Sequence, residues 1–76
     1  MTGVSLRKAP KVNGPTKVEV EALRLIANGY DQATVAHHLG ITAWAVQGIT
    51  YRMRHRLGAS NMPQMIYMAV KRGWIE

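Results

Sequence analysis

The chain has 76 residues, no cysteine, ten Lys and Arg residues against four Asp and Glu residues, and a formal net charge of +6. This length allows one small domain, and the lack of cysteine excludes disulfides, zinc thiolates, iron–sulfur clusters and thiol catalysis. No apolar run approaches the roughly 20 residues of a membrane-spanning helix, and the first residues lack the apolar stretch of a signal peptide. A cytoplasmic globular protein is therefore expected.

The excess positive charge is distributed unevenly. The only acidic residues are Glu19, Glu21, Asp31 and Glu76, so residues 32–75 contain no carboxylate side chain. Exposed helix surfaces usually mix both signs. A polyanionic partner is therefore expected, and nucleic acid is the usual one. A membrane surface is not expected, because no segment combines a broad apolar face with a lysine-rich one.

The first 14 residues differ from the rest of the chain. They show no periodic pattern, so residues 1–14 are predicted to form a flexible basic tail. This tail either has no binding role or contacts the phosphates of a nucleic acid. The folded domain is expected to span residues 15–76. Thr16 and Glu19 have the spacing of a capping box, and Gly29 is expected to end the first helix. Its apolar positions recur at helical spacing: Ala22, Leu23, Ile26 and Ala27.

A helix, a tight glycine turn and another helix follow one another in the middle of the chain. Asp31 is expected to cap a short second helix that ends at Gly40, and Thr42 to cap a third helix over residues 43–57. This order is the sequence form of a helix-turn-helix motif.

The last segment predicts a fourth helix. Asn61 and Gln64 have the spacing of a second capping box, and Gly73 follows the last helical residue, near Arg72. Since the sequence contains no strand pattern or internal repeat, the fold class is predicted to be all-α with four helices.

The third helix has two chemically different sides when its residues are placed about 100° apart. The side expected to face the core holds Val46, Ile49, Thr50, Met53 and Leu57. The opposite side holds Trp44, Gln47, Gly48, Tyr51 and His55. Arg52 and Arg54 lie on the two flanks, the arrangement of a helix whose centre contacts bases while its edges reach phosphates.

This pattern predicts specific DNA contacts. The expected base-reading residues are Trp44, Gln47, Gly48 and Tyr51. A glutamine amide matches adenine, an aromatic ring can pack on a thymine methyl group, and glycine lets the helix backbone approach the groove floor. The expected phosphate contacts are Thr42, Arg52, Arg54 and Arg56. Two alternatives remain: a merely hydrated helix face, and a position of Trp44 at the core edge, where it braces the helix start.

From Thr16 onward, the sequence resembles the LuxR-type (GerE-like) DNA-binding domain over about 60 residues. The matching segments are TKVEVEAL (16–23), LIANGY (25–30), VAHHLGIT (35–42), Val46, RLGA (56–59) and AVKRGWI (69–75). The resemblance implies a four-helix helix-turn-helix domain whose third helix enters the major groove and whose fourth helix dimerises.

The same resemblance assigns the base-reading positions of the family to Gln47, Gly48 and Tyr51. These are unusual residues there, so the target sequence should differ from typical family sites. Several family phosphate contacts are replaced, among them the arginine that opens the fourth helix, which is Met62 here. Because no receiver or ligand-sensing segment is recognised, a stand-alone effector controlled by its abundance or by a partner is expected.

The fourth helix is rich in methionine. Met62, Met65 and Met68 recur every three residues, and methionine suits adaptable interfaces. They are predicted to form the interface of a weak homodimer that DNA strengthens, or alternatively to fill a thin core irregularly. The apolar residues expected to face the core of the domain are Ile66, Ala69 and Val70.

Enzyme activity is not expected. The sequence shows no paired acids on one helix face, no nucleophile with a base, and no glycine-rich phosphate loop. His37, His38 and His55 lack co-ligands for a metal, and no cofactor or small-molecule substrate is expected. The predicted function is a DNA-binding transcriptional regulator with double-stranded DNA as partner. The alternatives are a module that binds RNA polymerase, a sigma factor or another regulator, and a nonspecific DNA-coating protein.

Overall fold

Four helices make up the fold: α1 (Lys17–Ala27), α2 (Gln32–Leu39), α3 (Ala43–Leu57) and α4 (Met62–Lys71). The computed structural model describes residues 14–76, and that range contains no strand. The predicted all-α, four-helix fold is therefore confirmed, and the predicted third helix agrees at both ends. Apart from residue 14, the predicted tail lies outside the described residues.

Side chains that accept backbone hydrogen bonds determine where the helices begin. The Thr16 hydroxyl accepts from the Glu19 N–H at 3.2 Å, and the Glu19 carboxylate accepts from the Thr16 N–H at 2.9 Å. This is the reciprocal capping box that the sequence predicts. Asp31 and Thr42 accept the equivalent bonds at the starts of α2 and α3, as expected.

The start of α4 departs from the prediction in one bond. Asn61 accepts from the Gln64 N–H at 2.8 Å, but the Gln64 side chain accepts from the Ser60 N–H and not from that of Asn61. The Asn61 backbone is more extended (φ −155°) than that of the other caps. This conformation presents the preceding amide to Gln64, so the second capping box is only half formed.

A glycine turn fixes α3 relative to α2. Gly40 has a φ of 70°, in the left-handed region that glycine adopts without a steric penalty. The next residue, Ile41, donates its N–H to the Ala36 carbonyl at 3.0 Å, which closes the end of α2. Two residues later α3 begins, so the predicted helix-turn-helix is present.

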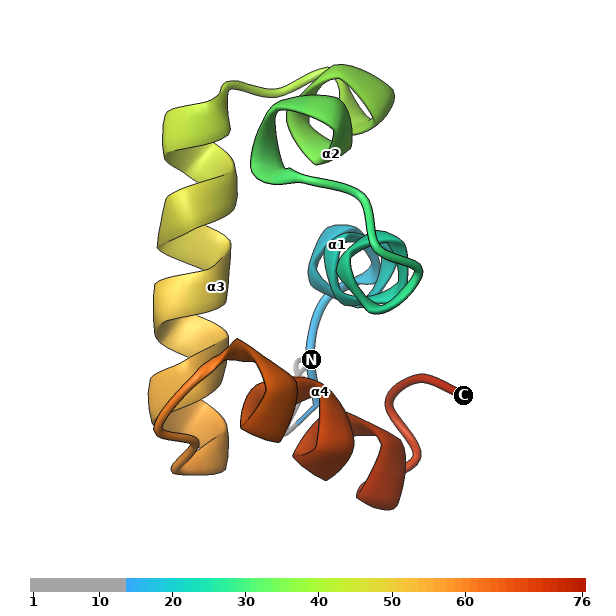
Figure 1. Cartoon of the computed structure of the whole chain (residues 1–76), viewed down its shortest axis with the longest axis vertical. Coiled ribbons are helices and arrows are strands. Elements are labelled where there is room, and N and C mark those ends of the chain that lie inside the picture. The colour runs from blue at the N-terminus through green and yellow to red at the C-terminus, as the bar shows by residue number, and fades with distance from the viewer. Residues whose placement is uncertain (1–13) are drawn as a thin grey trace, which may run out of the picture.

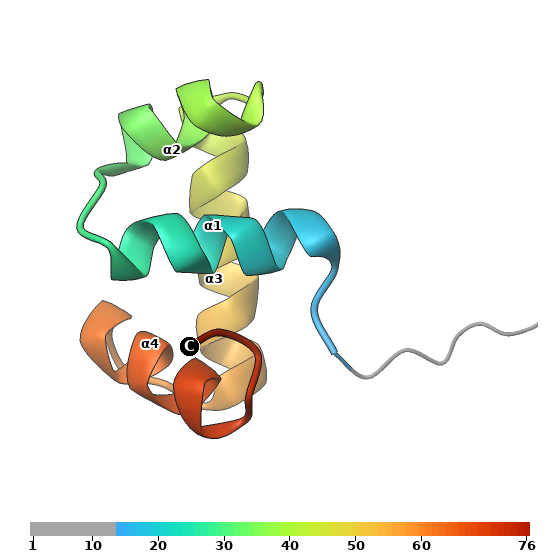
Figure 2. The same cartoon turned by 90° about the vertical axis from the view of Figure 1, so that its right-hand side faces the viewer.

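The core lies on one side of α3. Figures 1 and 2 show α3 standing along the long axis of the molecule, with α1, α2 and α4 all on the same side of it. The largest fully buried side chains come from all four helices: Leu23, Val35, Val46, Met53 and Met65. A small domain has few elements with which to cover its helices, and in the described part of the chain no helix lies on the opposite side of α3.

Two residues expected in the core are exposed. Ala27 lies in the last turn of α1, and Val70 of α4 keeps 43% of its surface exposed. The core instead takes Leu25, because α1 lies between α2, α3 and α4 in Figure 1, and Ile75, because the chain turns back after α4. In contrast, α4 lies at the edge of the molecule, where part of its surface meets solvent.

We expect the cap of α2 to make stability depend on pH. Hydrogen bonds to Asp31, first from the Thr34 backbone N–H and then from the Thr34 hydroxyl, hold the pKa of Asp31 below its ordinary value of 3.8. A carboxyl whose pKa is lowered by folding stabilises the fold fully above its unfolded pKa. This contribution is lost as the pH falls through the folded-state value.

Replacing Asp31 with Asn tests this, because asparagine is also a good cap but does not titrate in this range. The melting temperature of Asp31→Asn, followed by circular dichroism, should fall less between about pH 6 and pH 2 than that of the unmodified protein. An equal fall in both proteins would contradict the assignment.

Candidate nucleic-acid interface

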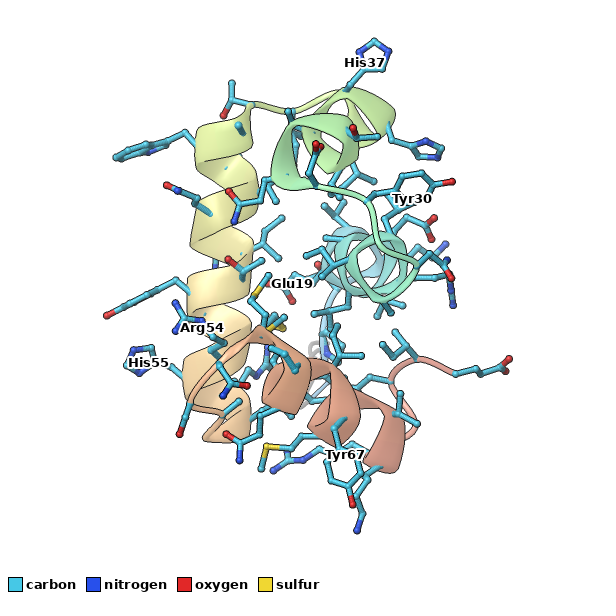
Figure 3. The ribbon with its side chains drawn as sticks, viewed as in Figure 1. Glu19, Tyr30, His37, Arg54, His55 and Tyr67 are labelled. Carbon is cyan, nitrogen blue, oxygen red and sulfur yellow. The ribbon has the colours of Figure 1, made fainter. Side chains whose placement is uncertain are left out.

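The uncovered side of α3 carries the residues predicted to contact DNA. Trp44 is 82% exposed and Tyr51 57% exposed, and Gln47 and His55 are exposed as well. Figure 3 shows His55 pointing away from the other helices. The predicted core side is confirmed, since its five residues are all buried: Val46, Ile49, Thr50, Met53 and Leu57. The exposure of Trp44 contradicts the alternative in which it braces the helix start at the core edge.

One flank of this exposed side opens into a groove of about 650 Å³. All four predicted base-reading residues line it, together with Arg54. In Figure 3, Arg54 lies between α3 and the start of α4. Thr50 of α3 also lines the groove, and the remaining lining residues come from the start of α2 and from the segment at the start of α4: Gln32, Ser60, Asn61 and Met62. None of these five residues was predicted to contact DNA. The groove therefore joins polar groups of three elements along one edge of α3.

The other flank of α3 faces the start of α1. The Arg52 and Arg56 guanidinium groups lie 3.9 and 3.8 Å from the Glu19 carboxylate. Only 13% of the Glu19 side chain is exposed, and its capping box with Thr16 holds it in place. The sequence pattern explains Glu19 by its cap alone, because spacing along the chain gives no sign of a contact with a helix more than 30 residues away.

Arg56 is bound within the fold. Its guanidinium donates to the Gly14 carbonyl at 3.2 Å and lies 5.8 Å from the centre of the Trp74 ring. The Arg72 guanidinium lies 5.7 Å from the same ring. Arg56 thus connects the segment before α1, α1 itself and the segment after α4, and any phosphate would compete with these internal partners.

Two further groups modify the exposed side of α3. The Tyr51 and His55 rings lie 4.4 Å apart at their centroids and are tilted by 51°, so they support one another on the surface. Thr42, a predicted phosphate contact, already accepts a bond from the backbone of α3. Its hydroxyl hydrogen can still be donated to an acceptor.

On α4, the methionines do not form one surface. Met65 is fully buried, so the prediction that it faces a partner subunit is wrong. It lies four residues before buried Ala69, on the core side of the helix. Met62 and Met68 are half-buried, and the most exposed large hydrophobic side chain of α4 is Tyr67, with the Lys71 Nζ atom 5.6 Å from its ring centre.

No side-chain arrangement for metal binding occurs among residues 14–76, since no three His, Asp or Glu side chains there come close enough together. No helix within the same part of the chain is long and apolar enough to cross a membrane. The described surface of α3 presents exposed aromatic and amide groups beside guanidinium groups.

Replacing Arg56 with Ala should destabilise the fold. A backbone hydrogen bond, a partly exposed ion pair and a cation–π contact would be lost, together worth about 1–2 kcal/mol. We expect the melting temperature to fall by roughly 5–15 °C. The control is Arg54→Ala, because Arg54 makes no hydrogen bond or ion pair with any described residue. Equal melting temperatures for the two variants would contradict a structural role of Arg56.

Comparison with solved structures finds a similar arrangement in the LuxR-type receptor VqmA of Vibrio cholerae, which is described as a dimer with a target DNA. The two structures agree with a TM-score of 0.76 and 28% sequence identity over 92% of this chain. The chain spans 33% of the length of that receptor. Neither a protein-family model nor a curated protein matches the sequence. The helix order, the glycine turn before α3 and this similarity show that the chain has the fold of a LuxR-type (GerE-like) helix-turn-helix domain.

Proposed function

We propose that this domain binds double-stranded DNA in a sequence-dependent manner and regulates transcription, with α3 as the helix that enters the major groove. The observation that carries the proposal is the uncovered side of α3, where exposed Gln47 and Tyr51 lie between guanidinium groups on both flanks. The similarity to a LuxR-type receptor with a target DNA supports it. Such a regulator would act in the cytoplasm, in association with the nucleoid.

The dimensions of α3 suit this role. Its 15 residues span roughly 22 Å, and the major groove of B-DNA is about 12 Å wide and accepts one α-helix. Gln47 can form two hydrogen bonds with an adenine edge, while Tyr51 and Trp44 offer ring surfaces to thymine methyl groups. Arg54, in the groove between α3 and α4, is placed for a phosphate on one side of the DNA groove.

Sequence-dependent binding can be tested by selecting bound sequences from random duplex DNA. We expect an enriched motif for the unmodified protein, and a relaxed preference at one A·T pair for Gln47→Ala, with a loss of about 1–3 kcal/mol at that position. Arg54→Ala should weaken binding to all sequences alike and lower the salt slope by about one.

Measuring the binding at increasing salt concentrations distinguishes a sequence-specific regulator from a nonspecific DNA-coating protein. A sequence-specific regulator keeps its preference as salt rises, whereas a coating protein shows only the steep loss caused by counterion release. Absence of an enriched motif, together with tight binding to purified RNA polymerase, would contradict the proposal and favour the protein-interaction module.

We also propose that two copies bind adjacent half-sites, because one recognition helix reads too few base pairs for a specific site. The similar VqmA structure is a dimer. On α4, exposed Tyr67 and Val70 now replace Met65 as the expected contacts, and half-buried Met62 and Met68 remain candidate contacts.

Binding to a duplex with two half-sites one helical turn apart, about 10 base pairs, tests this. Sedimentation should show two protein molecules on each duplex with positive cooperativity. Tyr67→Asp should lower the cooperativity, because a charge in the interface must be desolvated, but should leave binding to a single half-site unchanged. Independent binding of the two copies by the unmodified protein would contradict a dimer.

A further inference from the structure

A glycine lies in the middle of the exposed side of α3. Gly48 has ordinary helical geometry, with no left-handed backbone to explain its presence. Glycine in a helix interior destabilises the helix relative to alanine, because its backbone loses more freedom on folding. Its place in the helix therefore requires another explanation.

The Arg52 guanidinium occupies the space beside this glycine. A Cβ atom added at position 48 would lie 3.3 Å from the Arg52 Nη1 atom, closer than ordinary van der Waals contact. Side chains on a helix lean toward its N-terminus, so a residue covers the turn before its own Cα. Arg52 is therefore folded back beside Gly48, while 60% of its side chain remains exposed.

Glu19 holds the other end of this guanidinium. The Arg52 Nη2 atom lies 3.9 Å from Glu19 Oε2, and Glu19 is itself fixed by the capping box of α1. The other two described acids before α3 are engaged elsewhere: Glu21 pairs with Arg24, and Asp31 caps α2. At 3.9 Å the carboxylate attracts the guanidinium electrostatically without a hydrogen bond, which favours the position of Arg52 beside Gly48.

We propose that Arg52 recognises a guanine base through its guanidinium, which lies beside Gly48. Gly48 and Glu19 are positioning residues: Gly48 leaves space for the guanidinium, and Glu19 attracts it. This inference rests on the proposed function and changes the role expected for Arg52, which sequence analysis predicted as a phosphate contact. The guanidinium matches the O6 and N7 acceptors of guanine in the major groove. The Glu19 carboxylate nearby would repel a phosphate more strongly than the neutral edge of a base.

Base-by-base comparison of binding for four proteins tests the proposal: the unmodified chain, Arg52→Ala, Gly48→Ala and Glu19→Gln. Glutamine at position 19 can still accept the capping bond of α1 but removes the negative charge. Alanine at position 48 favours the helix. Melting curves should therefore show folded proteins in each case.

We expect the selected motif to contain a G·C pair whose preference falls by roughly 5- to 100-fold in Arg52→Ala, with the other positions unchanged. Gly48→Ala and Glu19→Gln should weaken the same preference, and should have no further effect at that pair when added to Arg52→Ala. Replacing that guanine with 7-deazaguanine, which lacks the N7 acceptor, should weaken the unmodified protein but not Arg52→Ala.

Two results would overturn the proposal and can be told apart. If Arg52→Ala weakens binding to all sequences alike and lowers the salt slope by about one, Arg52 is a phosphate contact and the proposed function stands. If the unmodified protein enriches no motif, both the guanine contact and the proposed function fail. An undiminished G·C preference in Gly48→Ala and Glu19→Gln would remove the positioning role of these two residues.

Discussion

The packing of three short helices against a single side of α3 determines the rest of this structure. Buried residues from α1, α2 and α4 meet the core side of α3, and within residues 14–76 no further element covers the opposite side. The exposed side is thus rigidly supported from behind but free to meet a ligand. This combination of a firm scaffold and an open face is what a recognition helix requires, because flexible side chains read bases best from a fixed backbone.

Glu19 connects this packing to the candidate interface. It closes the capping box that starts α1, and the same carboxylate lies near two guanidinium groups of α3. Its low exposure makes these interactions less screened than those of a surface ion pair. The two flanks of α3 consequently differ: one is held by α1, whereas the other opens into a groove beside α4 with Arg54. Arg52, Arg54 and Arg56 lie close together in the sequence of α3, but they have different surroundings and therefore different expected roles.

The sequence predicted the features that depend on local patterns. Caps such as Thr16 and Asp31, the turn at Gly40 and the buried side of α3 follow from hydrogen-bonding chemistry and helical period, and all are confirmed. It failed where the outcome depends on which helices are neighbours. Met65, expected at a partner interface, is buried in the core, and Val70, expected in the core, is exposed. The reason is that the other helices cover only one side of α4. The approach of Glu19 to Arg52 depends on how α1 crosses α3, which no spacing along the chain encodes.

The uncovered side of α3 is the surface that we propose meets DNA. The most direct test follows backbone amide resonances of the full chain as a selected duplex is added at moderate salt. We predict that the largest changes fall on residues 44–55 of α3, with smaller ones at Gln32 and Asn61, which line the adjoining groove. Changes concentrated on α4 and the end of α1, with α3 unaffected, would contradict the account.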